Sequence, residues 1–391
     1  KTGLFTAVSG VGYFCNTTLA PFTVTLPAGT AGDVIAFADY AATWQTNAVT
    51  VSPNGTDKIG SINTSVTLNT EGQSVTFVFV DSTQGWINTM DSTSNVRGAS
   101  FMCASVSGAC NTLTTSGNCK IATFTGPGTF TVNSVSSIAA NNAVSYLVVA
   151  GGASGGNYGG GGGGGGFRED QSPVTPYTAS PLEGAGALTV TAQGYPVVIG
   201  AGGARTDCAS VQLGNDGSPS SIFSKTSTGG GGGGGNNATP LESSGRPGGS
   251  GGGASNQNAN GSAGNGNTPP TSPAQGFPGG GTTSCGGASN RSGAGGGATV
   301  VGGTGANPAS GNGGAGATTS INGTPTSFSG GGGGGSGSPS AGGAASPCGT
   351  GKPGVPSLNA DKTAAANTGG GGGGGNNSPS VPERGGGGGG S

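Results

Sequence analysis

The side chains that could perform chemistry in this chain are carboxylates, because the sequence contains no histidine. Histidine is the usual general base and the commonest metal ligand, so its absence excludes Ser-His-Asp and Cys-His catalytic sites. Paired carboxylates could still hydrolyse a glycan as acid and base. The candidates are Glu169, Asp170 and Glu183, or Asp207 and Asp216. The simpler interpretation, which we adopt, is solvated loop charges with an ion pair to Arg168, and therefore no enzyme.

The glycine runs of this chain do not fit a phosphate-binding loop. A Walker loop needs Lys-Ser or Lys-Thr directly after its glycines, and a dinucleotide-binding loop lies between a strand and a helix. Neither context occurs in this sequence. We therefore expect no nucleotide and no other cofactor.

The cysteines are odd in number, so at least one thiol is unpaired within a single chain. The spacing of Cys103, Cys110 and Cys119 matches no zinc pattern, and we expect no metal site. Small buried thiols are the first interpretation. A disulfide between Cys110 and either Cys103 or Cys119 is the alternative. The other cysteines are Cys15, Cys208, Cys285 and Cys348.

Charge and composition exclude several classes of partner. Only 7% of the 391 residues are charged and the net charge is -2, which excludes a basic nucleic-acid-binding surface and gives no support for binding acidic membranes. No apolar stretch approaches 18 residues, so we expect no membrane insertion. Asn, Ser and Thr replace charge between the glycines, a composition typical of stable extracellular or virion β-proteins.

Residues 1–100 predict short β-strands separated by Gly and Pro turns, with no convincing helix. The expected strands are Phe22–Leu26, Asp33–Phe37, Ala48–Val51, Ser65–Leu68 and Ser74–Val80. Strands this short give one chain a thin core. We therefore expect an intertwined homotrimer in which three chains share one apolar interior.

Residues 101–150 are expected to form a β bridge to the glycine region. Cys119–Phe124 and Thr129–Val132 read as a strand and its returning partner across a Gly-Pro-Gly turn. Val144–Val149 is a near-continuously apolar strand that runs directly into the first glycine segment. An anchoring strand of this kind indicates that the glycine segment is ordered. Farther on, Leu188–Ala192 and Tyr195–Ile199 are expected to form a hairpin.

Residues 151–391 hold most of the 93 glycines, and five runs are uninterrupted: 159–166, 229–235, 330–335, 369–375 and 385–390. Polyglycine can form a polyproline II helix, which has three residues per turn and no internal hydrogen bonds. Its amide groups then need partners on neighbouring helices, and glycine lets those backbones approach closely. We predict a sandwich of such polyglycine II helices joined by exposed loops. The alternative is an unstructured linker.

The same packing predicts where glycine is needed. A central helix requires glycine at every position, whereas a peripheral helix requires it only on inward faces. Interrupted runs such as 248–253 and 293–297 fit the second kind. Binding would then use loop aromatics and arginines, although each aromatic could instead pack against the sandwich. The candidates are Tyr158, Phe167, Tyr177, Phe277, Phe328, Arg205, Arg246, Arg291 and Arg384, with Phe277 in Pro269–Pro278 the strongest.

Several long strings resemble the glycine-rich domain of phage tail fibres, a group common in phages of marine bacteria. They are Gly126–Val132, Val144–Gly152, Gly166–Glu169, Val190–Gly203 and Gly266–Pro270. Two earlier strings, Thr25–Tyr40 and Val80–Asn88, resemble a β module of trimeric fibre shafts. Together these strings cover most of the chain.

This resemblance implies a virion fibre that recognises the host. In related tail-tip adhesins of T-even-like phages, a polyglycine sandwich displays variable loops to the bacterial surface. The implied partners are a host surface receptor (a glycan or an outer-membrane protein), further copies of the chain in a homotrimer, and other tail or fibre proteins. A tailspike-like glycan depolymerase and a structural or ice-binding glycine-rich extracellular protein are the alternative functions.

Overall fold

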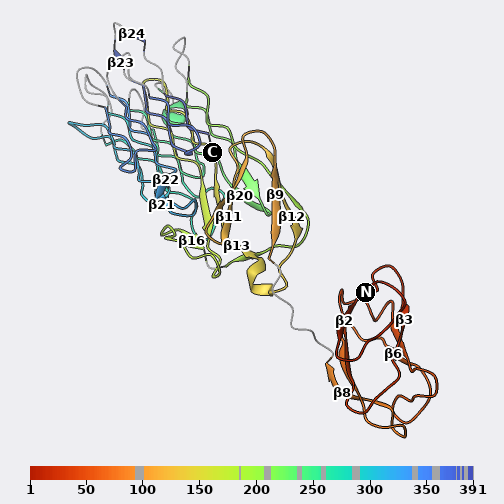
Figure 1. Ribbon diagram of the computed structural model, residues 1–391. Helices are drawn as coiled ribbons and strands as arrows, with labels where there is room; N and C mark the ends of the chain where they lie inside the picture. Colours follow the sequence, from red (N-terminus) through yellow and green to blue (C-terminus); the bar gives the residue numbers. More distant parts are fainter. Residues whose placement is uncertain are drawn as a thin grey trace. The chain divides into compact units, whose positions relative to one another are not determined.

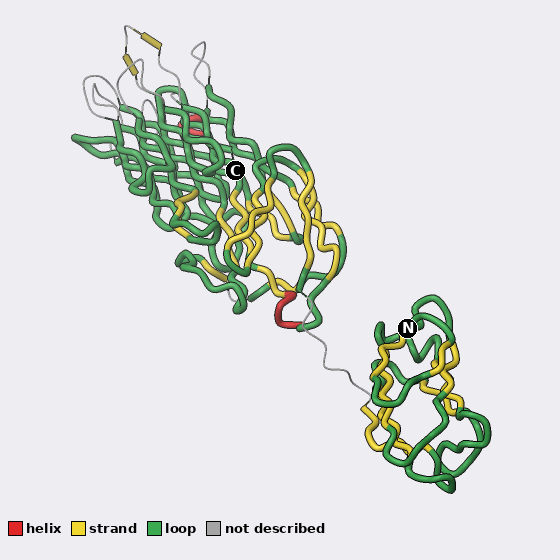
Figure 2. The backbone as a smooth tube through the Cα atoms, viewed as in Figure 1, coloured by secondary structure: helices red, strands yellow, loops and turns green. Residues whose placement is uncertain are grey.

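The computed structural model describes residues 1–92, 101–184, 186–206, 213–235, 240–256, 261–283, 291–336, 342–354, 362–375, 377–378, 381–382 and 386–390 (Figure 1). Its contacts divide the chain into two compact units, Lys1–Gly98 and Ala99–Ser391. The helical segments within the described ranges are two single turns, η1 Ala139–Asn142 and α1 Pro240–Ser243 (Figure 2). The expected fold class, all-β and glycine-rich, is confirmed. None of these helical turns is long or apolar enough to span a bilayer.

The first unit contains two four-stranded sheets that share one core. The first sheet runs in the order β1 Phe5–Thr6, β3 Phe22–Thr25, β5 Val49–Ser52 and β6 Val66–Leu68. The second runs in the order β2 Gly12–Cys15, β4 Val34–Asp39, β7 Ser74–Phe79 and β8 Trp86–Ser92. Alternating residues of both sheets point inward, as the sequence pattern predicted for β3, β4 and β7.

The core of the first unit is complete within one chain. Trp44 and Trp86 are fully buried in it, together with Cys15 and Phe37. Burying an aromatic side chain contributes roughly 1.5–3 kcal/mol, so these rings dominate the stability of the unit. A thin core was the reason to expect three chains to share one interior. One chain buries a core of its own, and the homotrimer stays a prediction.

Most β-strands of the second unit lie beside its glycine-rich part, whereas β21 and β22 lie along this part and β23 and β24 lie at its far end (Figure 1). They are β9 Cys103–Ser107, β10 Thr112–Ser116, β11 Cys119–Thr123, β12 Gly128–Ser134, β13 Ala143–Val144, β14 Tyr146–Val149, β15 Phe167–Asp170, β16 Glu183–Gly184, β17 Leu188–Thr189, β18 Gly194–Val197, β19 Ser220–Ile222, β20 Lys225–Ser227, β21 Ala317–Thr319, β22 Thr326–Phe328, β23 Asn377–Ser378 and β24 Val381–Pro382. The strands expected as a separate bridge therefore belong to the same unit as the glycine region.

Two predicted strand pairings in this unit are wrong. β11 pairs with β10, through a turn in which Gly117 has a positive φ of 57°, and not with β12. A two-residue turn with positive φ suits the twist of a tight hairpin, which explains the local pairing. β12 pairs instead with β9 and β18, and β17 pairs with β13. The predicted segments Leu188–Ala192 and Tyr195–Ile199 thus each contain part of a short strand, β17 and β18, but they do not form a hairpin.

The centre of the glycine region is run 159–166. Successive amide N–H groups of this run donate hydrogen bonds to three neighbouring segments in turn. Every third residue donates to the same neighbour, so that Gly160 bonds to Gly234 and Gly163 to Gly231. The three neighbours that accept in this way are segments 228–234, 293–296 and 369–372. A repeat of three is the period of a polyproline II helix.

The carbonyl groups of the same run accept from three further neighbours, segments 150–153, 250–253 and 332–335. Six backbones therefore surround the run and leave no room for side chains. A Cβ atom at Gly160 would lie 1.9 Å from the carbonyl oxygen of Gly253, and one at Gly161 would lie 2.1 Å from that of Gly332. The predicted lattice of polyglycine helices is present, and its central helix needs glycine as expected (Figure 2).

Candidate functional site

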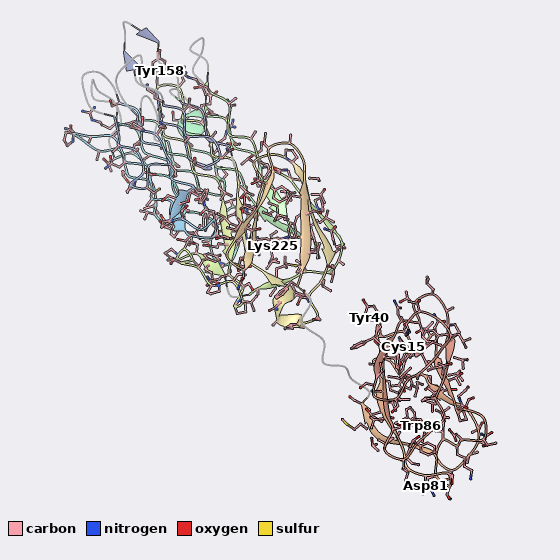
Figure 3. The ribbon with its side chains drawn as sticks, viewed as in Figure 1. Cys15, Tyr40, Asp81, Trp86, Tyr158 and Lys225 are labelled. Atoms are coloured by element: carbon pink, nitrogen blue, oxygen red, sulfur yellow. The ribbon has the colours of Figure 1, made fainter. Side chains whose placement is uncertain are left out.

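One end of the glycine lattice adjoins the strands that include β20, where Lys225 lies, and Tyr158 lies toward the other end (Figure 3). Ends of several runs meet around Tyr158, because the N–H of Gly335 bonds to the carbonyl of Gly159 at 2.9 Å and that of Gly375 to Gly156 at 3.0 Å. The Ser255 hydroxyl also donates to the Tyr158 carbonyl at 3.4 Å. Tyr158 itself has a positive φ of 51° and is half-buried. This end of the lattice, with Tyr158 at its centre, is the candidate attachment surface.

The structure does not bring the predicted contact residues together. Tyr177, Phe277 and Phe328 lie near the strand end of the lattice and are half-buried. Arg205 is exposed on the flank, and Arg246 forms an ion pair with Asp216 at 3.3 Å. Arg384 lies outside the described residues. Among the predicted contact residues that the structure describes, Tyr158 alone is a partly exposed side chain at the candidate attachment surface.

Two of the predicted contact residues are buried, so their assignment to a binding surface is wrong. Phe167 is 1% exposed and packs with Ala298 and Ala317 in a small core. It is the first residue of β15, which pairs with β14, so the chain enters a sheet directly after the glycine run. Arg291 is 4% exposed and lies in an isolated bridge to Ser336. Neither side chain can reach a receptor.

The proline-rich segment around Phe277 is held by two polar side chains. The Asn267 side-chain oxygen accepts hydrogen bonds from the N–H groups of Thr271 and Gln275. Gln275 is 1% exposed, accepts from the Thr228 N–H at 2.8 Å and donates to the Pro269 carbonyl at 2.9 Å. These contacts order the loop and fix its junction with the lattice.

Glu169 lies on β15 and is buried, contrary to the expectation of a solvated loop charge. One carboxylate oxygen accepts a hydrogen bond from the Thr319 hydroxyl, and the other accepts from the Ser180 N–H at 2.9 Å. The Tyr177 hydroxyl is also buried, and it makes no hydrogen bond within the described residues. Burial, helped by the negative charge of Glu169, raises the pKa of Tyr177.

Asp170 faces the other side of β15, because successive residues of a strand point to opposite faces. It accepts a hydrogen bond from the Tyr146 hydroxyl, and burial together with this bond raises the pKa of Tyr146. Arg168 forms no ion pair within the described ranges and donates instead to the Thr226 carbonyl at 3.5 Å, so that expectation was wrong. The two carboxylates therefore point to opposite faces of β15 and have different hydrogen-bond partners. Asp207 lies outside the described residues.

The cysteines in the described part of the chain are all free thiols, so neither expected disulfide is present. Cys15 is buried as expected, but Cys103, Cys110 and Cys119 are exposed. Over the same residues, no three His, Cys, Asp or Glu side chains are arranged to hold a metal ion. Cys208 and Cys285 are not among the described residues.

Sequence reasoning missed the polar residues that position these surfaces. Gln275 and Asn267 stood in a segment that read only as proline-rich, and Ser255 followed an interrupted glycine run. Asn267 and Ser255 carried a usable signal, since Asn and Ser side chains hydrogen-bond to nearby backbone groups in turns. No local pattern marked Gln275.

Comparison with known families gives one match. A family model described as a glycine-rich domain matches residues 123–391. The match begins at the last residue of β11 and includes the later strands of the second unit as well as the whole lattice. No curated protein matches the chain.

Proposed function

The chain belongs to the glycine-rich domain family through residues 123–391, and on that premise we propose that it is a structural component of a phage tail fibre. In this proposal the protein is a non-enzymatic receptor-binding adhesin of the virion. The candidate attachment surface around Tyr158 contacts a host surface receptor, a glycan or an outer-membrane protein. The resemblance of strings such as Val144–Gly152 to phage tail-fibre domains supports this assignment.

The observation that carries the proposal is the lattice around run 159–166. Six hydrogen-bonded neighbours hold this run, and the ends of several runs meet at Tyr158. A rigid scaffold whose ends carry variable segments is the arrangement by which many proteins present recognition surfaces. Each amide bond contributes only about 1 kcal/mol net, but the bonds act together. The lattice can therefore support an attachment surface without an apolar core.

The proposal includes association with further copies of the chain as a homotrimer. The outer face of sheet β2-β4-β7-β8 supports it, because several exposed side chains on this face are apolar. Phe14 on β2 is 66% exposed, Val34 on β4 is 41% exposed and Met90 on β8 is 70% exposed. Exposed apolar side chains gathered on one face are a feature of interaction sites. Sedimentation of the full chain should give the mass of three copies, and Phe14→Glu should lower it, whereas Leu19→Glu, an exposed loop control, should not. A monomeric wild type contradicts the trimer.

Cell attachment tests the main proposal. Fluorescently labelled full-length protein is incubated with a panel of marine bacterial strains, and binding to intact cells is measured. We expect saturable binding to some strains. Tyr158→Ala should reduce it at least fivefold, whereas Tyr40→Ala, an exposed tyrosine of the first unit, should leave it unchanged. Absence of binding to every strain, or equal loss with both variants, contradicts the proposal. Release of new reducing ends from the cell glycans would favour a depolymerase instead.

A further inference from the structure

A polar cavity lies where the strands of the second unit meet the proline-rich loop. Its volume is about 140 Å³. The side chains that matter here are Tyr146, Arg168, Asp170, Lys225, Ser272 and Pro273. Lys225, at the start of β20, lies among these strands in Figure 3, in the part of the unit away from Tyr158. The cavity is thus separate from the candidate attachment surface.

Two cations in this cavity have unused hydrogen-bonding capacity. The Lys225 ammonium has no hydrogen-bond or ion-pair partner within the described residues, although its side chain is half-buried. Toward the described residues, the Arg168 guanidinium donates only the long 3.5 Å bond to the Thr226 carbonyl. A guanidinium carries five N–H donors, so most of them remain available. Both groups can therefore bind an incoming carboxylate.

Asp170 supplies one free acceptor beside these cations. Its Oδ2 atom accepts from the Tyr146 hydroxyl, which fixes the side chain. Its Oδ1 atom accepts no hydrogen bond from the described residues and lies 2.2 Å from the position that a Cβ atom at residue 184 would occupy. Glycine at position 184 therefore leaves the space that this oxygen needs. Glu169 also borders the cavity, but both of its oxygens already accept hydrogen bonds.

The unused hydrogen-bonding groups of Lys225, Arg168 and Asp170, together with the size of the cavity, indicate one class of ligand. A carboxylate satisfies Lys225 and Arg168, and a neighbouring hydroxyl donates to Asp170. The volume equals that of four to five water molecules at roughly 30 Å³ each, and it is below the roughly 300–1,000 Å³ of sites for drug-sized ligands. The cavity therefore has room for a single small ring, with Leu182, Phe167 and Pro273 as apolar lining.

We propose that this cavity binds one sugar-acid residue, with its carboxylate on Lys225 and Arg168 and a ring hydroxyl on Asp170. This binding does not depend on the proposed attachment role of the Tyr158 end. The lining carries charges of both signs, so affinity comes from these directed bonds more than from net charge, and we expect millimolar binding.

Titration of the full chain with D-galacturonate, followed by calorimetry, tests the proposal. D-galactose, which lacks the carboxylate, should bind at least fivefold more weakly. Lys225→Gln should weaken galacturonate binding at least fivefold and reduce the difference between the two sugars, because Arg168 remains. Lys120→Gln, the same charge change on the exposed β11, should leave both unchanged.

A second variant separates binding from folding. Gly184→Ala should displace the Asp170 carboxylate and weaken both sugars, while the thermal unfolding of Lys225→Gln should match that of the wild type. No binding of galacturonate, equal binding of the two sugars, or equal effects of Lys225→Gln and Lys120→Gln would each overturn the proposal. Lys225→Gln should retain cell attachment. A failure of the sugar-acid proposal can therefore be told apart from a failure of the proposed attachment function.

Discussion

Gly161 donates its amide N–H to the carbonyl oxygen of Gly293 at 3.1 Å, although the two residues belong to different glycine segments. On another side of the same helix, the position that a Cβ atom of Gly161 would occupy lies 2.1 Å from the Gly332 carbonyl oxygen. The two contacts have one cause. Amide groups that point outward in three directions require close neighbours in all of them. The absence of side chains is therefore a packing requirement in this run.

Replacement of Gly161 by alanine should destabilise the lattice. Overpacking a tight core costs roughly 1–3 kcal/mol, and here the added atom meets backbone, so we expect about 3 kcal/mol. Amide hydrogen exchange of peptides covering 159–166, measured by mass spectrometry, should rise accordingly.

Gly281→Ala is the matched control, because no atom lies within 4 Å of its added methyl group. Restricting the unfolded chain should then make it neutral or stabilising by roughly 0.4–1 kcal/mol. Equal protection of 159–166 in the two variants would show that the lattice does not depend on close backbone contact.

The sequence predicted those parts of the fold in which the pattern of apolar residues or glycines indicates one local structure. Alternation located β3, β4 and β7, because one face of each strand is buried. The length of run 159–166 correctly indicated a helix surrounded by others. The partners of that run were not predictable, because a run of identical glycines does not specify which residue bonds to which neighbour. The residues that flank the run set this alignment.

The candidate sites were also only partly predictable from the local sequence pattern. Phe167 follows a glycine run and read as a loop aromatic, yet it begins a strand. Its burial depends on Ala298 and Ala317, more than a hundred residues away in sequence. Lys225 and Asp170 likewise meet only because β14, β15 and β20 pack at one place. Local pattern therefore located individual residues, whereas their grouping required the tertiary structure.

The first unit should lose stability above pH 9 because of Cys15. Burial raises the pKa of this thiol to about 11. The folded state therefore keeps the proton more tightly than the unfolded chain, so its stabilising effect is complete below the unfolded pKa and is lost as the pH rises from about 9 to 11. The loss should be on the order of 2 kcal/mol.

Tryptophan fluorescence during denaturant unfolding measures this loss, because both tryptophans, Trp44 and Trp86, lie in the first unit. Cys15→Ala should show a smaller fall in midpoint over the same pH range. The difference between the two proteins isolates the thiol from other groups that titrate there. Parallel curves for wild type and variant would mean that the Cys15 thiol does not contribute to the pH dependence.

Cys348 should react faster with alkylating reagents than its partial burial suggests. Burial acts to raise the pKa of this thiol, but hydrogen bonds from Ser346, Thr350 and the Gly316 N–H outweigh it and lower the pKa. The Ser346 hydroxyl and the Gly316 nitrogen each lie 3.1 Å from the sulfur. Ser346→Ala should raise the pKa and slow iodoacetamide labelling of Cys348 several-fold near neutral pH, as quantified by peptide mass spectrometry. The exposed Cys103 provides an internal reference, and an unchanged ratio of the two rates would count against this role of Ser346.

Gln275 should hold the proline-rich loop to the lattice. Replacing it with alanine leaves the half-buried Thr228 N–H without its partner, which costs roughly 1–3 kcal/mol, whereas water can replace the bond to the carbonyl of the exposed Pro269. We therefore expect a loss of about 1–3 kcal/mol and faster hydrogen exchange over residues 266–278. Gln193→Ala removes an exposed glutamine of the same unit and should have little effect. If loss of Gln275 leaves exchange in 266–278 unchanged, the loop is ordered by the Asn267 side chain and by the backbone hydrogen bonds of the loop.

Because Phe277 lies in this loop, cell attachment by the Gln275→Ala variant also tests whether its ring contributes to binding. Attachment should survive loosening of this loop, since the candidate surface around Tyr158 lies at the other end of the lattice.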